Sequence, residues 1–266
     1  FSISDLHFKL LNEKPLMTSD KREAFKAQYE TQYAVWKTKP QPSIVHIDAE
    51  VAIFPEQQIA KFNLKYKFKN QTNTDITQVL VGRSKNYPWA EVHIKGAHKT
   101  HFDKKLNQAI FTFDKPLKVG ESRRLETKFT FKQPKLWPIR SHQIVSTDFS
   151  YLRSVPLLPT IGYQKNYELT SKSLREVYNL ADHSHLKPSE LFKQPHKSFG
   201  KYEFTTIKTR LSTKLGYQGI AQGKLIKQWQ QDNRSFFEFE TTKPIRAIPT
   251  WMSFPFSAIS KDNKKV

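Results

Sequence analysis

The chain has 266 residues, and 44 lysines and arginines against 24 aspartates and glutamates give it a net charge of +20. It has no cysteine, which excludes disulfides and thiolate metal sites. No segment approaches the roughly 18 consecutive apolar residues of a membrane-spanning helix, and the start at Phe1 shows no signal-peptide pattern. We expect a globular unit excised from a longer protein.

The positive charge is spread along the whole chain, without a block of five or six basic residues. A sequence-specific nucleic-acid reader usually concentrates its basic residues on one element, so no specific nucleic-acid partner is expected. Contact with anionic lipid, non-specific attraction to nucleic acid and a merely solvated lysine-rich surface remain as alternatives.

Residues 19–36 carry aromatic side chains at helical spacing. Phe25, Tyr29, Tyr33 and Trp36 recur every three or four residues and therefore share one face of a predicted helix. Asp20 and Glu23 suggest a capping arrangement at its start. This face either packs against the domain that follows, which we favour, or binds a partner.

From residue 43 onward the hydrophobic period becomes two, as in half-buried strands. Residues 61–69, 109–113 and 125–131 alternate apolar and polar side chains, with turn sequences between them. Residues 202–213 and 225–241 continue the pattern, and Asp232-Asn233 suits a hairpin turn. Strands at this spacing predict an all-β, antiparallel β-sandwich. Residues 171–181 read as a short inserted helix capped by Ser173 and Glu176.

Two groups of histidines are candidates for a metal site. His183 and His185, with Glu190 and His196 nearby, fall in a proline-containing segment that reads as a loop. A second cluster has only one carboxylate near it and no convincing third ligand; it comprises His93, His98, His101 and Asp103. Because H-E-x-x-H is absent as well, no metal site is expected within these residues.

Motifs for nucleophilic or phosphate chemistry are also missing. The sequence contains no G-x-S-x-G elbow, no cysteine and no phosphate-binding glycine loop. No catalytic residue is therefore assigned within the 266 residues.

The most unusual segment is "VPLLPTIGYQKNYEL", residues 155–169. Pro156 and Pro159 fix the backbone on either side of two leucines, and Gly162, followed by Tyr163, permits a close turn. We predict a rigid structural turn at which the chain leaves one sheet.

Four segments together resemble the N-terminal domain of the zinc-dependent alanyl aminopeptidase family, in the form that large bacterial membrane proteins join to an ABC-type permease region. They are residues 11–44, with a helix ending in Pro-Gln-Pro; residues 48–73, "DAEVAIFPEQQIAKFNLKYKFKNQTN"; residues 157–169, "LLPTIGYQKNYEL"; and residues 211–245. The resemblance implies a helical lead-in over residues 1–42, a β-sandwich over 43–260 and a tail over 261–266 that leads to a catalytic domain.

The resemblance implies that the chemistry lies outside this chain. The family's zinc motif, its later glutamate ligand and its G-x-M-E-N-like strand do not occur here. Zinc would belong to the catalytic domain, and the partners would be that domain, the permease region and peptides. The expected location is the extracytoplasmic side of the bacterial inner membrane.

In the family, this domain lends a Gln or Glu to the substrate cleft from the strand before the proline-containing turn. The matching positions are residues 148–153, where neither residue type stands, so Asp148 and Tyr151 are the candidates that the resemblance implies. The alternatives are that this strand only packs against its neighbours, and that the sandwich is a scaffolding module of a transporter-linked envelope protein without peptidase activity.

Overall fold

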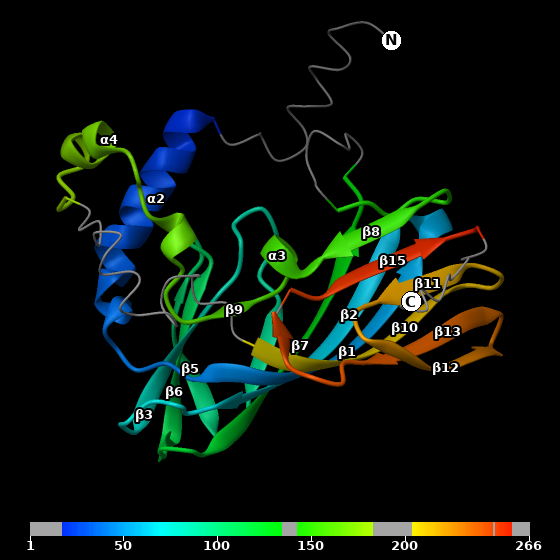
Figure 1. Ribbon diagram of the computed structural model, residues 1–266. Coiled ribbons are helices and arrows are strands. Elements are labelled where there is room, and N and C mark those ends of the chain that lie inside the picture. Colours follow the sequence, from blue (N-terminus) through cyan, green and yellow to red (C-terminus); the bar gives the residue numbers. More distant parts are fainter. Residues whose placement is uncertain (1–17, 135–142, 183–203, 247, 257–266) are drawn as a thin grey trace, which may run out of the picture.

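The computed structural model describes residues 18–134, 143–182, 204–246 and 248–256 (Figure 1). These residues are mostly strands, arranged as one large sheet and two smaller ones, with a helix at the N-terminal side. The all-β sandwich predicted from the sequence is confirmed.

The large sheet forms one layer of the sandwich, and its strands run in the order β12-β13-β10-β1-β2-β7-β4, with β14 paired to β10. Their bounds are β1 (Ser43–Phe54), β2 (Ile59–Lys69), β4 (Glu91–Ile94), β7 (Ser122–Lys132), β10 (Phe204–Lys214), β12 (Lys224–Gln231), β13 (Arg234–Glu240) and β14 (Ile245–Arg246).

The alternation predicted for β2 and β7 places one set of side chains in the core. Along β2, Phe62, Leu64, Tyr66 and Phe68 are buried, while the lysines between them face the other side. The hairpin between β12 and β13 turns at Asp232 and Asn233, whose φ angles of 49° and 57° belong to the left-handed region that such a two-residue turn requires.

One pairing departs from the antiparallel prediction. Strands β1 and β10 are parallel, with His46 opposite Thr206 and Ala52 opposite Ser212. About 150 residues separate the two strands along the chain. Parallel strands are joined by a long crossover rather than by a tight turn, so no local turn signal predicts this pairing.

Two smaller sheets cover the inner face of the large one. The first, here called the small sheet, has the order β11-β15-β8, and the second has the order β5-β6-β3-β9. Trp251 of the small sheet is fully buried and meets Phe62 edge-on, with 5.5 Å between ring centroids. The bounds are β3 (Ile76–Gly82), β5 (Ala97–Asp103), β6 (Gln108–Leu117), β8 (Ser150–Arg153), β9 (Thr160–Ile161), β11 (Gln218–Ala221) and β15 (Thr250–Phe254).

Helix α2 (Ser19–Tyr33), extended by the 3-10 turn η1 (Ala34–Lys37), covers the second smaller sheet on the side away from the large sheet (Figure 1). Its aromatic face is buried and packs with Leu80, Leu106 and Tyr163, so the packing interpretation is confirmed. The predicted cap was wrong: the N-cap is Thr18, whose hydroxyl accepts the N–H of Lys21.

The remaining helical segments are short. They are η2 (Pro55–Gln57), α3 (Ser154–Leu157), η3 (Lys165–Tyr167) and α4 (Lys172–Val177). Helix α4 confirms the inserted helix, but the capping prediction was wrong: the N-cap is Ser171, whose hydroxyl contacts that of Ser173, and no side chain caps the backbone. Among the described residues, no helix is long and apolar enough to cross a membrane.

Candidate functional site

The outer surface of the small sheet carries a row of apolar side chains. Met252 in β15 lies opposite both Tyr151 in β8 and Ile220 in β11, and Tyr151 also forms a bridge with Ile144. Residues directly opposite each other in an antiparallel pair point to the same face, so these four side chains share one side. Their sequence neighbours Trp251 and Leu152 point inward and are fully buried.

Aromatic rings enlarge this surface. Phe149 is 38% exposed and stacks on Tyr151, with 6.3 Å between ring centroids. Phe254, two residues after Met252, lies on the same side by alternation and stacks on the exposed Phe256. We use the term apolar face for six apolar side chains on the outer side of the small sheet and its bridge partner: Ile144, Phe149, Tyr151, Ile220, Met252 and Phe254. Contiguous exposed apolar surface of this kind marks contact sites for other proteins or domains.

The two sequence-predicted cleft residues lie at this surface in different settings. Tyr151 is half-buried on β8, an outer strand of the small sheet, whereas Asp148 is exposed in the bend before β8. That bend is held by Ser146, whose hydroxyl donates to the Phe149 carbonyl at 2.9 Å, and by the Tyr217 hydroxyl, which donates to the carbonyl of Thr147. The structure therefore brings the two residues to one edge of the apolar face, and their role toward a substrate stays a prediction.

The predicted proline-containing turn follows β8 directly and is anchored by backbone bonds. The N–H of Ser154 donates to the Pro249 carbonyl at 2.8 Å, and the N–H of Leu158 closes the single turn of α3 on the Ser154 carbonyl at 2.7 Å. Leu157, Leu158 and Pro159 are buried. Pro156 lies within α3, and Pro159 stands between α3 and β9.

Arg83 ties this turn to the sandwich core. Only 3% of Arg83 is exposed, and its Nε donates to the Leu157 carbonyl at 3.0 Å and its Nη1 to the Pro88 carbonyl at 2.5 Å. The guanidinium also lies over the Phe129 ring, 4.1 Å from its centroid. Burial lowers the pKa of Arg83 to about 10. Sequence reasoning missed this residue because a single arginine after a strand carries no local signal of burial.

The far end of the turn reaches helix α2. Gly162 has a φ of 74°, a conformation that a side chain would strain, and its N–H donates to the Leu80 carbonyl at 2.8 Å. Tyr163 is buried against Tyr29, with 5.1 Å between ring centroids. Burial is the main cause that raises the pKa of Tyr163 above its ordinary value. The turn thus connects the small sheet to the helix that covers the other end of the molecule.

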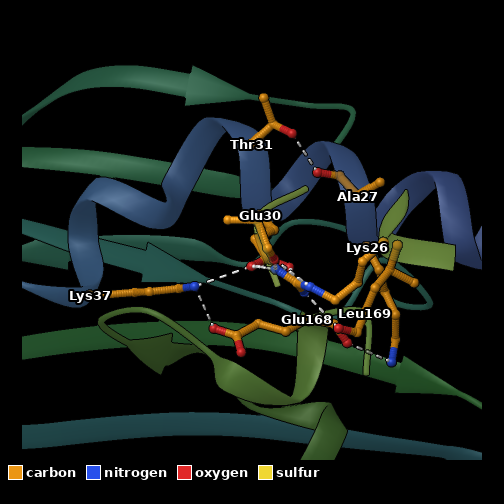
Figure 2. Close-up of polar contacts among 9 residues, drawn as sticks. Lys26, Ala27, Glu30, Thr31, Lys37, Glu168 and Leu169 are labelled. Atoms are coloured by element: carbon orange, nitrogen blue, oxygen red, sulfur yellow. Dashed lines mark hydrogen bonds and ion pairs between the residues drawn. The ribbon is translucent and has the colours of Figure 1, made fainter. Parts of the chain in front are cut away.

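A buried ionic cluster fixes α2 to the chain beyond this turn (Figure 2). Glu30 receives two hydrogen bonds from the Arg175 guanidinium, both at 2.9 Å, and each of these residues is 4% exposed. Lys37 lies between Glu30 and Glu168, with Nζ–oxygen distances of 3.2 and 3.0 Å. Arg175 also donates to the Leu169 carbonyl. Three separate elements therefore meet in one ionic cluster.

The electrostatics of this cluster keep Glu30 ionised. Burial opposes its charge, but the hydrogen bonds and charges of Arg175 and Lys37 together outweigh burial and lower the pKa of Glu30. Because the charges and hydrogen bonds of these side chains are paired with one another, we interpret the cluster as structural: it holds α2 against the segment that contains Arg175.

Histidines and carboxylates do not converge on a metal centre within the part of the chain that the structure describes, where no group of three or more such ligands occurs. His98 instead pairs with Asp114 at 3.0 Å on the exposed surface. The cluster of His183, His185, Glu190 and His196 lies outside the described residues.

The surface between α2 and β5 is hollowed, and Tyr33, Trp36, His101 and Asp103 help to line the depression. Burial and then the Asp103 carboxylate raise the pKa of Tyr33 to about 12. Asp103 also accepts the N–H of Leu106 at 2.9 Å. Tyr33 and Asp103 therefore have packing and hydrogen-bonding roles here, and we assign no catalytic role to the described residues that line this depression.

Comparison with known proteins gave matches among solved structures alone. No protein-family profile and no curated protein matches the chain. The chain is similar to the M1 zinc metallopeptidase from Deinococcus radiodurans, with a TM-score of 0.47 and 13% identity, over 80% of this chain and 42% of that one. A two-domain M1 zinc metallopeptidase mutant bound to L-tryptophan gives a TM-score of 0.46 and 12% identity, over 80% and 43%. The chain thus spans less than half the length of these proteins, and no residue role follows from such distant similarity.

Proposed function

We propose that this chain is the non-catalytic N-terminal β-domain of a zinc aminopeptidase-like protein, and that it covers and shapes the peptide-binding cleft of a catalytic domain. The observation that carries the proposal is the apolar face of the small sheet, which ends directly at the rigid turn. The resemblance of residues 157–169 to the aminopeptidase family supports the same interpretation. Zinc and the reacting groups would belong to the catalytic domain.

The geometry supports a docking role for this edge of the molecule. Tyr151 and Met252 lie side by side in the apolar face, and Arg83 and Ser154 hold the turn beside it through bonds to backbone carbonyls. A surface that must fit another domain benefits from such a fixed support, because flexible groups lose entropy when they are ordered on binding. Tyr151 and Asp148 are the side chains proposed to border the cleft.

Amide hydrogen exchange tests the docking. In the full-length protein that the proposal requires, the amides of β8, β11 and β15 should exchange more slowly than in the isolated 266-residue chain, because the catalytic domain covers the apolar face. The amides of β12, at the far edge of the large sheet, serve as the internal control and should not change. Equal exchange in both proteins at the small sheet would contradict the proposal.

Activity provides the second arm of the test. The isolated chain with added zinc should not hydrolyse an aminoacyl p-nitroanilide, whereas the full-length protein should. Hydrolysis by the isolated chain above background would place the chemistry in these residues and refute the non-catalytic role.

The apolar face equally suits a scaffolding module that binds another envelope protein. Two properties of the full-length protein distinguish these functions: the presence of H-E-x-x-H in its sequence and its peptidase activity. The scaffold would be favoured if the amides of the small sheet exchange more slowly in a full-length protein that has neither H-E-x-x-H nor peptidase activity.

We further propose that the domain belongs to a membrane protein and lies on the extracytoplasmic side of a bacterial inner membrane, linked through residues 1–42 to a permease region. This part rests on the resemblance of residues 11–44 to the family's linker helix. Protease added to spheroplasts, whose inner membrane is still sealed, should cleave the domain. Cleavage only after lysis would contradict this location.

A further inference from the structure

The solvent side of the large sheet differs between its two halves. In the half formed by β1, β10 and β13, acidic side chains pair with the cations. Lys208 lies 3.1 Å from a carboxylate oxygen of Glu238, and Arg210 lies 3.5 Å from one of Glu50. In this half, positive and negative side chains therefore lie close enough to offset each other's charge.

The other half, formed by β2, β7 and β4, carries a row of cations without such partners. Lys67 lies directly opposite Arg124, and the N–H of Lys95 donates to the Arg124 carbonyl at 3.1 Å, which continues the β4–β7 register. Their sequence neighbours Leu125 and Ile94 are buried, so the three cations point to the solvent side. We call Lys67, Arg124 and Lys95 the basic row. All three are exposed, and none forms an ion pair with a described residue.

Such an arrangement is unfavourable for the sheet itself, since like charges directly opposite each other destabilise a strand pair. The adjacent row shows that the sheet can place unlike charges together: Glu126 lies opposite both Lys65 and His93. Repulsion within the basic row therefore lowers the stability of the isolated chain, and an anionic partner would relieve this repulsion.

The surroundings of the basic row indicate the kind of partner. The same side of β2 and β7 carries further cations, Lys61, Lys65, Lys69, Lys128 and Lys132, against the carboxylates of Glu126 and, on β4, Glu91. The aromatic residues of β2 and β7 point toward the core, so in these strands the basic surface offers no ring on which a nucleic-acid base would stack. A cationic sheet surface instead complements a plane of anionic headgroups.

We propose that the basic row and the sheet surface around it bind the anionic surface of a lipid bilayer. The apolar face belongs to the opposite layer of the sandwich, so binding to lipid leaves it open. The inference rests on the charge arrangement and does not depend on the peptidase-like function proposed above. Each lysine or arginine close to an anionic bilayer strengthens partition by about fivefold.

Vesicle co-sedimentation of the 266-residue chain tests this proposal. The chain should bind vesicles of an equal mixture of phosphatidylcholine and phosphatidylglycerol, and should not bind vesicles of phosphatidylcholine alone. Removal of the basic row by the triple change Lys67→Gln, Arg124→Gln and Lys95→Gln should weaken partition by on the order of a hundredfold, the product of three such factors.

A matched variant separates the basic row from net charge. The triple change Lys21→Gln, Lys165→Gln and Lys172→Gln removes the same charge from exposed positions on the helical side, and should weaken partition much less. Circular dichroism and thermal unfolding show whether both variants remain folded. An equal loss of binding in the two variants would overturn the proposal, as would equal binding of the chain to neutral vesicles. Unchanged vesicle binding by the basic-row variant, together with weaker binding to duplex DNA, would assign the surface to nucleic acid instead.

Discussion

At the scale of single residues, two buried arginines hold segments that are distant in the sequence. Arg83 bonds to the carbonyls of Leu157 and Pro88, and Arg175 bonds to Glu30. A buried guanidinium loses its hydration and is tolerated only where its donors find fixed acceptors. Both residues therefore depend on the folded arrangement around them, and their replacement tests it.

Replacement of Arg83 by Met should lower the free energy of unfolding by about 3 kcal/mol, because it leaves two carbonyls without their donor. Urea unfolding followed by tryptophan fluorescence measures the change. The exposed Arg153 provides the control, since Arg153→Met should change stability by less than about 0.5 kcal/mol. A loss below about 1 kcal/mol for Arg83→Met would mean that the bonds only offset the cost of burying the charge.

Replacement of Glu30 by Gln should lower the free energy of unfolding by about 3 kcal/mol at neutral pH, because it leaves Arg175 without its charged partner. The pKa of Glu30 is lower in the folded state than in the unfolded chain. Its stabilisation is therefore fully present above the ordinary glutamate pKa of about 4.3, and is lost as pH falls through the lower folded-state value.

The difference in unfolding free energy between the wild type and Glu30→Gln should accordingly be constant at neutral pH and shrink in acid. Denaturant unfolding at a series of pH values gives this difference. Glu176 is exposed, and Glu176→Gln should show little difference at any pH. A wild-type advantage that grows on acidification would refute the role assigned to Glu30.

At the scale of elements, the small sheet depends on a close approach of β11 to the core. A Cβ atom at Gly219 would lie 2.6 Å from a ring carbon of Phe237 and 2.9 Å from a methyl carbon of Leu211. Gly219→Ala should therefore destabilise the protein by about 2 kcal/mol through overpacking. Thermal unfolding checks this, with the neighbouring Gln218→Ala as the control. A neutral result for Gly219→Ala would mean that β11 moves freely away from β13.

The regular strands could be predicted from the sequence because their alternation is a local property. Strands β2, β7, β10 and β13 each bury one face, and the period-two pattern identified them. Strand β5 is largely exposed and therefore lacks that pattern. The parallel pairing of β1 with β10 depends on the completed sandwich and has no local signal.

The candidate site was predictable only in part, for the same reason. Pro159 and Gly162 mark the turn in the sequence, because their effect on the backbone is intrinsic. The apolar face requires the register that sets Tyr151 beside Met252, which lie about 100 residues apart. The ionic cluster around Glu30 likewise joins side chains from three elements, and the sequence shows each one as an ordinary charged residue.

At the scale of the whole molecule, the sandwich presents two different surfaces on opposite layers. The small sheet exposes the apolar face, and the large sheet exposes the basic row. The proline-containing turn links the small sheet to helix α2 through Gly162 and Tyr163. We propose that one layer meets a catalytic domain and that the other meets an anionic membrane surface.

The most direct test of the central proposal is the steady-state hydrolysis of alanyl p-nitroanilide by the full-length protein carrying Ile220→Asp. Ile220 is 40% exposed in the apolar face, and Ile226, 54% exposed in β12, provides a matched control away from it. We expect Ile220→Asp to lower kcat/KM by about tenfold or more, because a charge buried in the domain contact costs well over 1.4 kcal/mol. Ile226→Asp should leave kcat/KM unchanged. Equal activity of both variants and the wild type would contradict the account, as would a full-length protein without peptidase activity.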